Sequence, residues 1–149
     1  MDLEWLDFLH QIELNIKVNL LLVKKVIPGM INNKSGKIVT IGSIYSDKPN
    51  SNLTHYTTAK AALEGFTKAM ALELAPIGIR VNMVSPSVIS TELTADIPEK
   101  IKLITAAQTP LRRLAMSEDV AGAISFLASE KSNFLSGETI RINGGQVMI

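Results

Sequence analysis

Several residue types that build common functional sites are absent or scarce in this sequence. It contains no cysteine, which excludes disulfide scaffolds and thiolate-bound zinc. Its only histidines are His10 and His55, so a histidine-rich metal centre is not expected. Charged residues make up 19% of the chain and the formal net charge is +1, a balance that argues against a module that coats nucleic acid. Any chemistry must therefore come from other residue types.

Long apolar runs are also absent, since none approaches the roughly 20 residues that cross a membrane. The first residues, Met-Asp-Leu-Glu, lack the basic region of a signal peptide, so we expect a cytoplasmic protein without a membrane partner. What the chain does have is 46% hydrophobic residues over 149 positions, enough for a compact core. These features predict a soluble globular protein with residues 1–149 in one domain.

Three short segments are rich in β-branched residues, the composition of strands: 37–42, 79–84 and 139–142. The first is almost continuously hydrophobic, so we expect a buried strand that is covered on both faces. Helical segments separate the three, and strands that alternate with helices form a parallel sheet through crossover connections. The sequence therefore predicts an α/β fold, in which a parallel sheet carries helices on both faces.

The helical segments are bounded by turn and capping residues. The first is expected over about 3–30, where Pro28 marks its end. The second begins near Asn52, which can cap it, and runs to Gly78. A later helix is expected to be capped by Ser117. The second and the later helix therefore make the crossovers between the strands.

The carboxyl ends of the predicted strands carry small or hydroxylated residues, at the edge of a parallel sheet where ligands bind. Ser43 follows the first strand and Ser85 follows the second. Tyr56 and Lys60 lie four residues apart, on one face of a helix near its N-terminal end. A lysine cation and the helix dipole both favour the phenolate, which suits Tyr56 to acid–base work near neutral pH. A surface tyrosine beside a solvated lysine is the alternative that this short pattern leaves open.

Together these motifs form a longer ordered pattern. Ser43 precedes Tyr56 by thirteen positions, Lys60 follows, and the chain closes on Gly-Glu-Thr-Ile-Arg-Ile-Asn-Gly-Gly over 137–145. The pattern resembles the short-chain dehydrogenase/reductase family over nearly the whole chain, and within it the 3-oxoacyl-[acyl-carrier-protein] reductases. The resemblance implies a Rossmann-like fold and an NAD(P)H-dependent oxidoreductase that reduces a carbonyl to an alcohol, with a 3-oxoacyl thioester as the expected substrate.

The resemblance also implies catalytic roles for four residues. Tyr56 would donate a proton to the carbonyl oxygen of the substrate, and Ser43 would hydrogen-bond the same oxygen. Lys60 would support Tyr56 electrostatically and bind the ribose hydroxyls of the nicotinamide. The fourth residue is an asparagine of the first helix that supports a proton-relay water. Asn15 and Asn19 are both candidates, and the spacing to the first strand favours Asn15.

The segment after the second strand resembles the family's nicotinamide-binding stretch. It reads Pro-Ser-Val-Ile-Ser-Thr over 86–91, with Ser87 where the family has glycine. The cofactor would be NADP or NAD, with NADP preferred on the same resemblance, and no metal is implied. The cofactor-binding residues that the resemblance implies are Tyr56, Lys60, Pro86, Ile89 and Thr91.

Further expectations from the resemblance concern the substrate and the partners. Residues 94–111 would form a mobile lid whose apolar side chains, such as Ile101, suit an acyl substrate. Arg112 and Arg113 would meet an acidic acyl carrier protein, or are simply solvated charges. The helix over 53–75 carries apolar residues on more than one face. In the family this helix and the first one form a four-helix interface, which implies a homo-dimer or homo-tetramer.

The family's glycine-rich turn, which holds the pyrophosphate of the cofactor at a helix N-terminus, is absent from this sequence. The chain therefore resembles the later part of the family's domain, with the catalytic residues and without the nucleotide-binding half. Two hypotheses follow. Either the chain is the catalytic part of an oxidoreductase, or it is a truncated, inactive remnant or oligomerisation module that binds no nucleotide.

Overall fold

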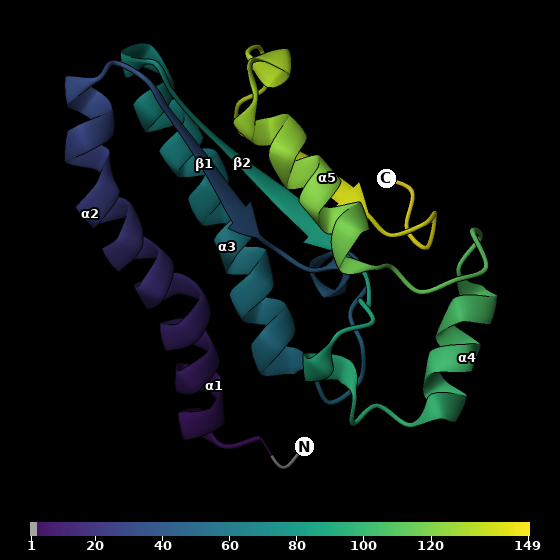
Figure 1. The fold of residues 1–149 in the computed structure, drawn as a ribbon. Coiled ribbons are helices and arrows are strands. Elements are labelled where there is room, and N and C mark those ends of the chain that lie inside the picture. The colour runs from purple at the N-terminus through teal and green to yellow at the C-terminus, as the bar shows by residue number, and fades with distance from the viewer. Residues whose placement is uncertain (1–2) are drawn as a thin grey trace.

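The computed structural model describes residues 3–149, which form a parallel sheet of three strands. The strands, in spatial order, are β1 (Gly36–Ile41), β2 (Ile79–Pro86) and β3 (Thr139–Ile142). Gly36 lies opposite Ile79 at one end of the sheet, and Pro86 lies opposite Ile142 at the other. The predicted α/β fold and parallel sheet are confirmed (Figure 1).

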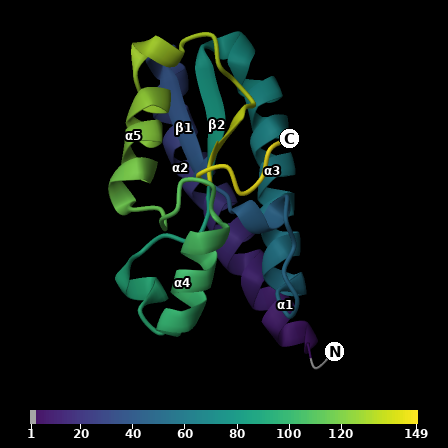
Figure 2. The same cartoon turned by 90° about the vertical axis from the view of Figure 1, so that its right-hand side faces the viewer.

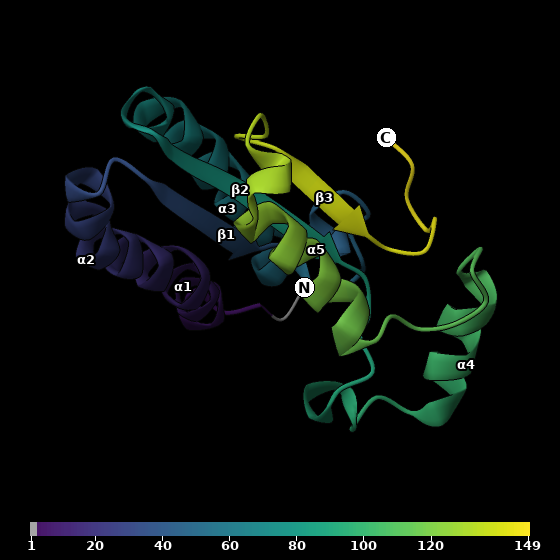
Figure 3. The same cartoon turned by 45° about the horizontal axis from the view of Figure 1, so that its top comes forward.

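Helices cover both faces of this sheet. They are α1 (Trp5–Ile12), α2 (Val18–Asn32), α3 (Thr54–Leu74), α4 (Glu99–Gln108) and α5 (Ser117–Ala128). α2 and α3 pack on one face, and α5 packs on the other (Figures 2 and 3). α4 stands apart, beyond the carboxyl ends of the strands (Figure 1). Among the described residues, no helix has the length and apolar character needed to cross a membrane.

α1 and α2 belong to one continuous helix, in which the π-helical turn Glu13–Lys17 joins the two parts. The predicted helix over about 3–30 is observed over 5–32, so it includes Pro28 and ends at Asn32, two residues beyond the expected end. A proline lacks one backbone donor and so weakens the helix locally. Ile27 and Met30, on either side of Pro28, pack against the core of the sheet, and this packing carries the helix past the proline.

Each face of β2 supports its own apolar core, because side chains alternate across a strand. The core beneath α3 comprises Ala71, Leu74, Ile79 and Val81. The core beneath α5 comprises Val84, Val120 and Leu127. β2 is buried along nearly its whole length between these two clusters, so it is the central support of the molecule.

β1 is less buried than the sequence predicts. Thr40 is the one residue of this strand in the buried class, and Ile41 is 43% exposed. The reason is topological, since within residues 3–149 β1 pairs with β2 alone and lies at the edge of the sheet. The prediction of a buried strand is therefore wrong for most residues of β1.

Two predicted helix caps are also wrong. Asn52 adopts a positive φ of 63°, and Leu53 occupies the capping position of α3 without a side-chain hydrogen bond. Ser117 is the first residue of α5, and Met116 caps the helix. The N–H of Met116 donates to Oδ2 of Asp119 at 2.7 Å. The start of α5 is therefore fixed from inside the helix by a carboxylate, which also complements the helix dipole.

Candidate active site

The carboxyl end of β1 and the first turns of α3 bring Tyr56 and Lys60 together. Nζ of Lys60 lies 5.7 Å from the centre of the Tyr56 ring. The same atom donates a hydrogen bond to the backbone oxygen of Ile41, 2.8 Å away. Lys60 is half-buried, and desolvation on burial lowers the pKa of its ammonium group. This ammonium group links the end of the sheet to the phenol ring.

Ser43 lies in the loop that leaves β1. The N–H of Gly42 donates to the carbonyl of Val84 at 2.8 Å, so the ladder between β1 and β2 continues up to the residue before the serine. Ser43 is buried, and its Oγ accepts a hydrogen bond from the N–H of Tyr45 at 3.3 Å. Its backbone oxygen accepts from Oγ of Ser46 at 2.6 Å. The Ser43 hydroxyl is held as an acceptor here and keeps its own proton to donate to a ligand.

The two candidate asparagines lie in and just after the π-helical turn. Asn15 is 7% exposed, whereas Asn19 is half-buried. Nδ2 of Asn15 donates to the backbone oxygen of Gln11 at 3.0 Å, and Nδ2 of Asn19 donates to the backbone oxygen of Asn15 at 2.7 Å. The turn packs against α3, the helix that carries Tyr56. π-helical turns occur frequently at functional sites, and here the turn places Asn15 on the buried side of its helix.

The segment after β2 is pinned near the end of the sheet. Pro86 is the buried last residue of β2, whereas Thr91 is exposed. Ile89 forms an isolated parallel bridge with Ala115 and packs in the core beneath α5. Oγ1 of Thr94 donates to the carbonyl of Ile89 at 2.6 Å and accepts from the N–H of Thr91 at 3.0 Å. Of the predicted cofactor residues, Pro86, Ile89 and Thr91 therefore share one folded segment, with Pro86 at its base and Thr91 at its surface, whereas Tyr56 and Lys60 stand on α3.

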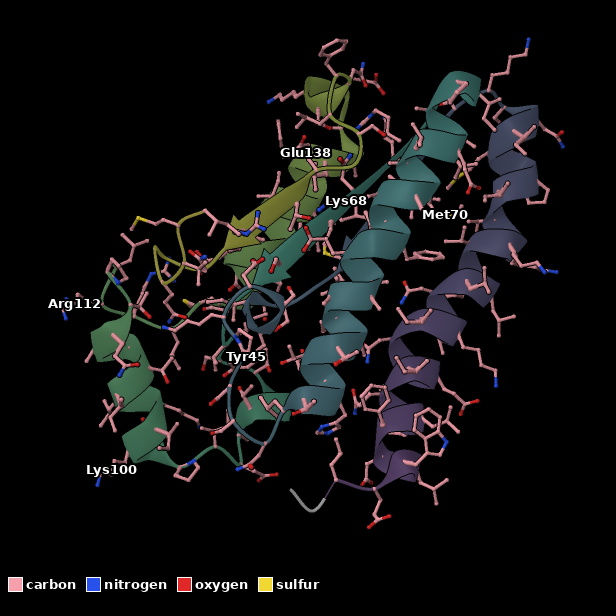
Figure 4. All side chains as sticks on the ribbon, turned by 180° about the vertical axis from the view of Figure 1, so that it is seen from behind. Tyr45, Lys68, Met70, Lys100, Arg112 and Glu138 are labelled. Atoms are coloured by element: carbon pink, nitrogen blue, oxygen red, sulfur yellow. The ribbon has the colours of Figure 1, made fainter. Side chains whose placement is uncertain are left out.

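A cavity of about 210 Å³ lies between the Ser43 loop and α4. The ring of Tyr45 lines it and meets the ring of Tyr56 edge-on, with centroids 6.3 Å apart. Figure 4 shows Tyr45 in the loop beside α3. The cavity wall includes Ile44, Tyr45 and Lys48 from the loop, Val88 from the segment after β2, and Thr105 and Gln108 from α4.

α4 presents polar side chains to this cavity rather than the apolar ones expected from the sequence. Thr105 and Gln108 line the cavity. Ile101, Leu103 and Ile104 are 49%, 63% and 42% exposed and do not line it. The structure therefore does not support the expectation that the apolar residues of this segment face an acyl substrate.

Tyr45 and Asp47 are two residues of the site region that no sequence pattern singled out. Tyr45 lines the cavity, and Asp47 binds Arg141 of β3 through Oδ2 and Nε at 2.7 Å. Their position could have indicated a role in the site, since both residues follow the carboxyl end of a strand in a parallel sheet, where ligands bind. Their partners are distant in the sequence, so the pattern alone does not indicate what they contact.

The similar proteins described below are longer than this chain. The sequence matches the family model described as Enoyl-(Acyl carrier protein) reductase over residues 1–146. It is 38% identical over 143 residues to the 3-oxoacyl-[acyl-carrier-protein] reductase FabG of Rickettsia conorii. The aligned region covers 96% of this chain and 59% of that protein. FabG of Escherichia coli is 38% identical to this chain over 148 residues, and the aligned region covers 99% of this chain and 59% of FabG. The chain spans 59% of the length of these curated relatives.

Solved structures agree with this relationship. A 3-oxoacyl-[acyl-carrier protein] reductase from Brucella melitensis superposes with a TM-score of 0.94 at 29% identity, over 99% of this chain and 56% of that one. A gluconate 5-dehydrogenase from Burkholderia cenocepacia, in complex with NADP and tartrate, superposes with a TM-score of 0.92 at 28% identity. The match covers 97% of this chain and 58% of that one. With the family model matched over nearly the whole chain, this protein belongs to the short-chain dehydrogenase/reductase family of oxidoreductases.

Proposed function

We propose that this chain forms the catalytic part of an NAD(P)H-dependent reductase that converts a carbonyl to an alcohol, with a 3-oxoacyl thioester as substrate. The observation that carries the proposal is that Lys60 lies over the ring of Tyr56 and binds the backbone of Ile41 at the carboxyl end of β1, two residues before Ser43. The relatives named as 3-oxoacyl-[acyl-carrier-protein] reductases support the substrate class. An acyl carrier protein as partner and the cytoplasm as location remain predictions on the same ground.

The residues present fit the nicotinamide end of the cofactor. Lys60 gives one hydrogen bond to Ile41, so its ammonium group has two further donors for ribose hydroxyls. Oγ of Ser85 is buried at the carboxyl end of β2 without a partner among the described residues. Pro86, Ile89 and Thr91 follow it. The pyrophosphate end has no matching glycine-rich turn in this sequence, so the proposed contacts are confined to the nicotinamide end.

The chain's own residues supply the proton and orient the carbonyl. A bound NAD(P)H would supply the hydride that the carbonyl carbon receives. Tyr56 donates its hydroxyl proton to the carbonyl oxygen, and Ser43 donates a hydrogen bond to the same oxygen. The charge of Lys60 stabilises the tyrosinate that remains. Asn15 supports the water through which Tyr56 regains its proton, so the carbonyl gains one hydride and one proton in total.

A second candidate function is an oligomerisation module without activity. Leu14, Leu21 and Leu22 of the long first helix are 54%, 57% and 60% exposed, and Leu72 of α3 is 80% exposed. Exposed apolar side chains gathered on neighbouring helices are typical of association surfaces. The same surface serves the reductase proposal, in which the chain forms a homo-dimer or homo-tetramer.

The two arginines considered for carrier binding are engaged within the chain. Arg113 binds Asp119 through both carboxylate oxygens, at 2.6 and 2.8 Å. Arg112 has a positive φ of 58°, and its Nη1 donates to the backbone oxygen of Ala107 at 2.5 Å. Arg113 therefore holds the start of α5, and the proposed carrier protein has no support from this pair.

NADPH oxidation with a 3-oxoacyl thioester tests the proposed activity, and the matched variants are Tyr56→Phe and Tyr45→Phe. The two rings are neighbours, and each variant removes the phenolic hydroxyl of one of them. We expect Tyr56→Phe to lower the turnover by about 100- to 10,000-fold, because it removes the general acid. We expect Tyr45→Phe to stay within about tenfold of the wild type. Equal losses in both variants contradict the role of Tyr56.

Fluorescence titration with NADPH and NADH tests how strongly this chain holds the cofactor. Without a pyrophosphate-binding turn, the isolated chain should bind either nucleotide weakly or not at all, and Tyr56→Phe should leave nucleotide binding largely intact. A dissociation constant in the micromolar range would contradict the expected weakness. Turnover separates the two candidate functions: measurable turnover supports the reductase, and its complete absence favours the oligomerisation module.

A further inference from the structure

Asp47 and Arg141 form a bidentate ion pair across the carboxyl end of the sheet, where the candidate site lies. Nε of Arg141 donates to Oδ2 of Asp47 at 2.7 Å, and Nη2 donates to Oδ1 at 3.1 Å. The side chain of Asp47 is 10% exposed and that of Arg141 is 24% exposed, so the pair is largely removed from water. Hydrogen bonding to Asp47 raises the pKa of Arg141. Bidentate pairs of this kind constrain orientation as well as distance.

The pair joins elements from opposite edges of the sheet. Asp47 lies six positions after the end of β1, which is one edge strand. Arg141 belongs to β3, the other edge strand, opposite Ser85 of β2 in the register. Residues 42–47 must therefore pass over the carboxyl end of β2 to reach Arg141.

The loop between β1 and α3 has a defined attachment at each end of this passage. At its start, Gly42 donates to Val84 at 2.8 Å. Within it, the hydrogen bonds are local, as between Asp47 N–H and the carbonyl of Ile44 at 3.0 Å. Among residues 3–149, Arg141 supplies the hydrogen bonds that tie residues 43–50 to another element of the fold. Without this pair the loop would be held only by its own turn and by side-chain packing.

We propose that Asp47 and Arg141 are positioning residues that hold the loop carrying Ser43 and Tyr45 against the end of the sheet, facing Tyr56. This inference rests on the proposed function, since Ser43 needs a defined position only if it orients a substrate. The pair touches neither the proposed substrate oxygen nor the nicotinamide. It acts through Ser43, four residues before Asp47, and through Tyr45, whose ring meets that of Tyr56 at 6.3 Å.

A second pair in the same chain provides a matched control. Arg113 and Asp119 are also joined by two hydrogen bonds, at 2.6 and 2.8 Å, but they lie at the start of α5. The variants Arg141→Gln and Arg113→Gln therefore remove the same kind of contact from two places. Arg141→Lys keeps the charge and loses the planar fork, so it reports on the geometry of the pair.

Amide hydrogen exchange of the full chain, resolved by residue, tests the proposal. The reporters are the amides of Ser46, Asp47 and Lys48, which donate to Ser43 or Ile44 inside the loop. We expect Arg141→Gln to raise their exchange rates about tenfold or more, with the amides of α5 unchanged. Arg141→Lys should restore part of the protection. Arg113→Gln should raise exchange at the start of α5 and leave the three reporters unchanged.

Unchanged reporters in Arg141→Gln, or an equal increase across the whole chain, overturn the proposal, because the pair is then dispensable or merely stabilising. If Arg141→Gln does not fold, Asp47→Asn gives the same comparison with a smaller change in volume. Turnover of a 3-oxoacyl thioester by the same proteins judges the proposed function separately. If Arg141→Gln raises exchange in the loop but the wild type shows no turnover, the proposed function fails and the positioning role stands. If the wild type turns over substrate but the three reporters are unchanged in Arg141→Gln, the positioning role fails and the function stands.

Discussion

α3 and the long first helix lie side by side on one face of the sheet, yet they bury very different surfaces (Figure 4). The buried residues of α3 recur at helical spacing: Ala59, Leu63, Thr67, Ala71 and Leu74. Of the described residues of the first helix, 5–32, Asn15 and Val23 alone are buried. The first helix packs beside the edge strand β1, whereas α3 packs on the central strand β2.

This difference teaches how the candidate site is supported. Tyr56 and Lys60 stand on a helix that is fixed by the main core, so their positions follow from the packing of α3. Asn15 stands on a helix with little core of its own, and many apolar side chains of that helix face outward. We therefore expect the stability of the chain to depend on α3, and its association to depend on the first helix.

The largest expected effect is that of Leu63→Ala. Leu63 is 1% exposed, and truncation of a fully buried leucine lowers the free energy of unfolding by about 2–5 kcal/mol. Leu22→Ala on the first helix is the control, since this leucine is 60% exposed and its loss should change the free energy by less than about 0.5 kcal/mol. Urea unfolding followed by circular dichroism measures both. Equal losses would contradict the contrast between the helices.

A smaller loss is expected from Thr67→Val. Oγ1 of Thr67 donates to the carbonyl of Leu63 at 2.8 Å and lies 2.7 Å from Oγ1 of Thr40 in β1. The valine leaves the buried Thr40 hydroxyl without its closest partner, which destabilises by about 1–3 kcal/mol. Thr58→Val, on the exposed face of the same helix, should change little. The same urea titration decides between them, and a neutral Thr67→Val would show that this hydrogen bond contributes nothing to the support of α3.

The pH dependence of stability should report on Lys60. Burial lowers the pKa of Lys60, so the unfolded chain holds this proton up to higher pH than the folded chain does. Charged Lys60 therefore destabilises the folded state at neutral pH. This penalty disappears as the pH rises through the lowered pKa to the ordinary value of about 10.4. Unfolding midpoints of Lys60→Met and the wild type should converge toward alkaline pH, and a constant difference would refute the burial effect.

The smallest effect on stability, with a clear effect on association, is expected from the double variant Leu21→Ser and Leu22→Ser. Both side chains are more than half exposed in the single chain, so the free energy of unfolding of the monomer should change by less than about 0.5 kcal/mol per residue. Sedimentation velocity should show that the wild type is a dimer or tetramer and that the variant dissociates. Lys25→Ser on the same helix is the control, and assembly that survives the double variant would exclude this face as the interface.

Much of the fold and of the candidate site follows from local sequence signals. β-branched segments predicted all three strands, and the i, i+4 spacing of Tyr56 and Lys60 predicted their proximity on one helix face. Asn52 and Ser117 show the limit of such signals, since both are good capping residues and neither caps a helix in the structure. Local hydrogen bonds compete with the packing of whole elements, and packing decided where these helices begin.

By itself, the sequence determined the alternation of strands and helices, because each element depends on residues close together along the chain, and it determined the family through the order and spacing of its motifs. The tertiary structure alone decided that β1 is an edge strand, that Asn15 is buried while Asn19 is half-buried, and that Asp47 meets Arg141. The two partners of that ion pair are separated by 94 positions. Contacts over such distances depend on how the strands are ordered in the sheet, and no local pattern of residues records that order.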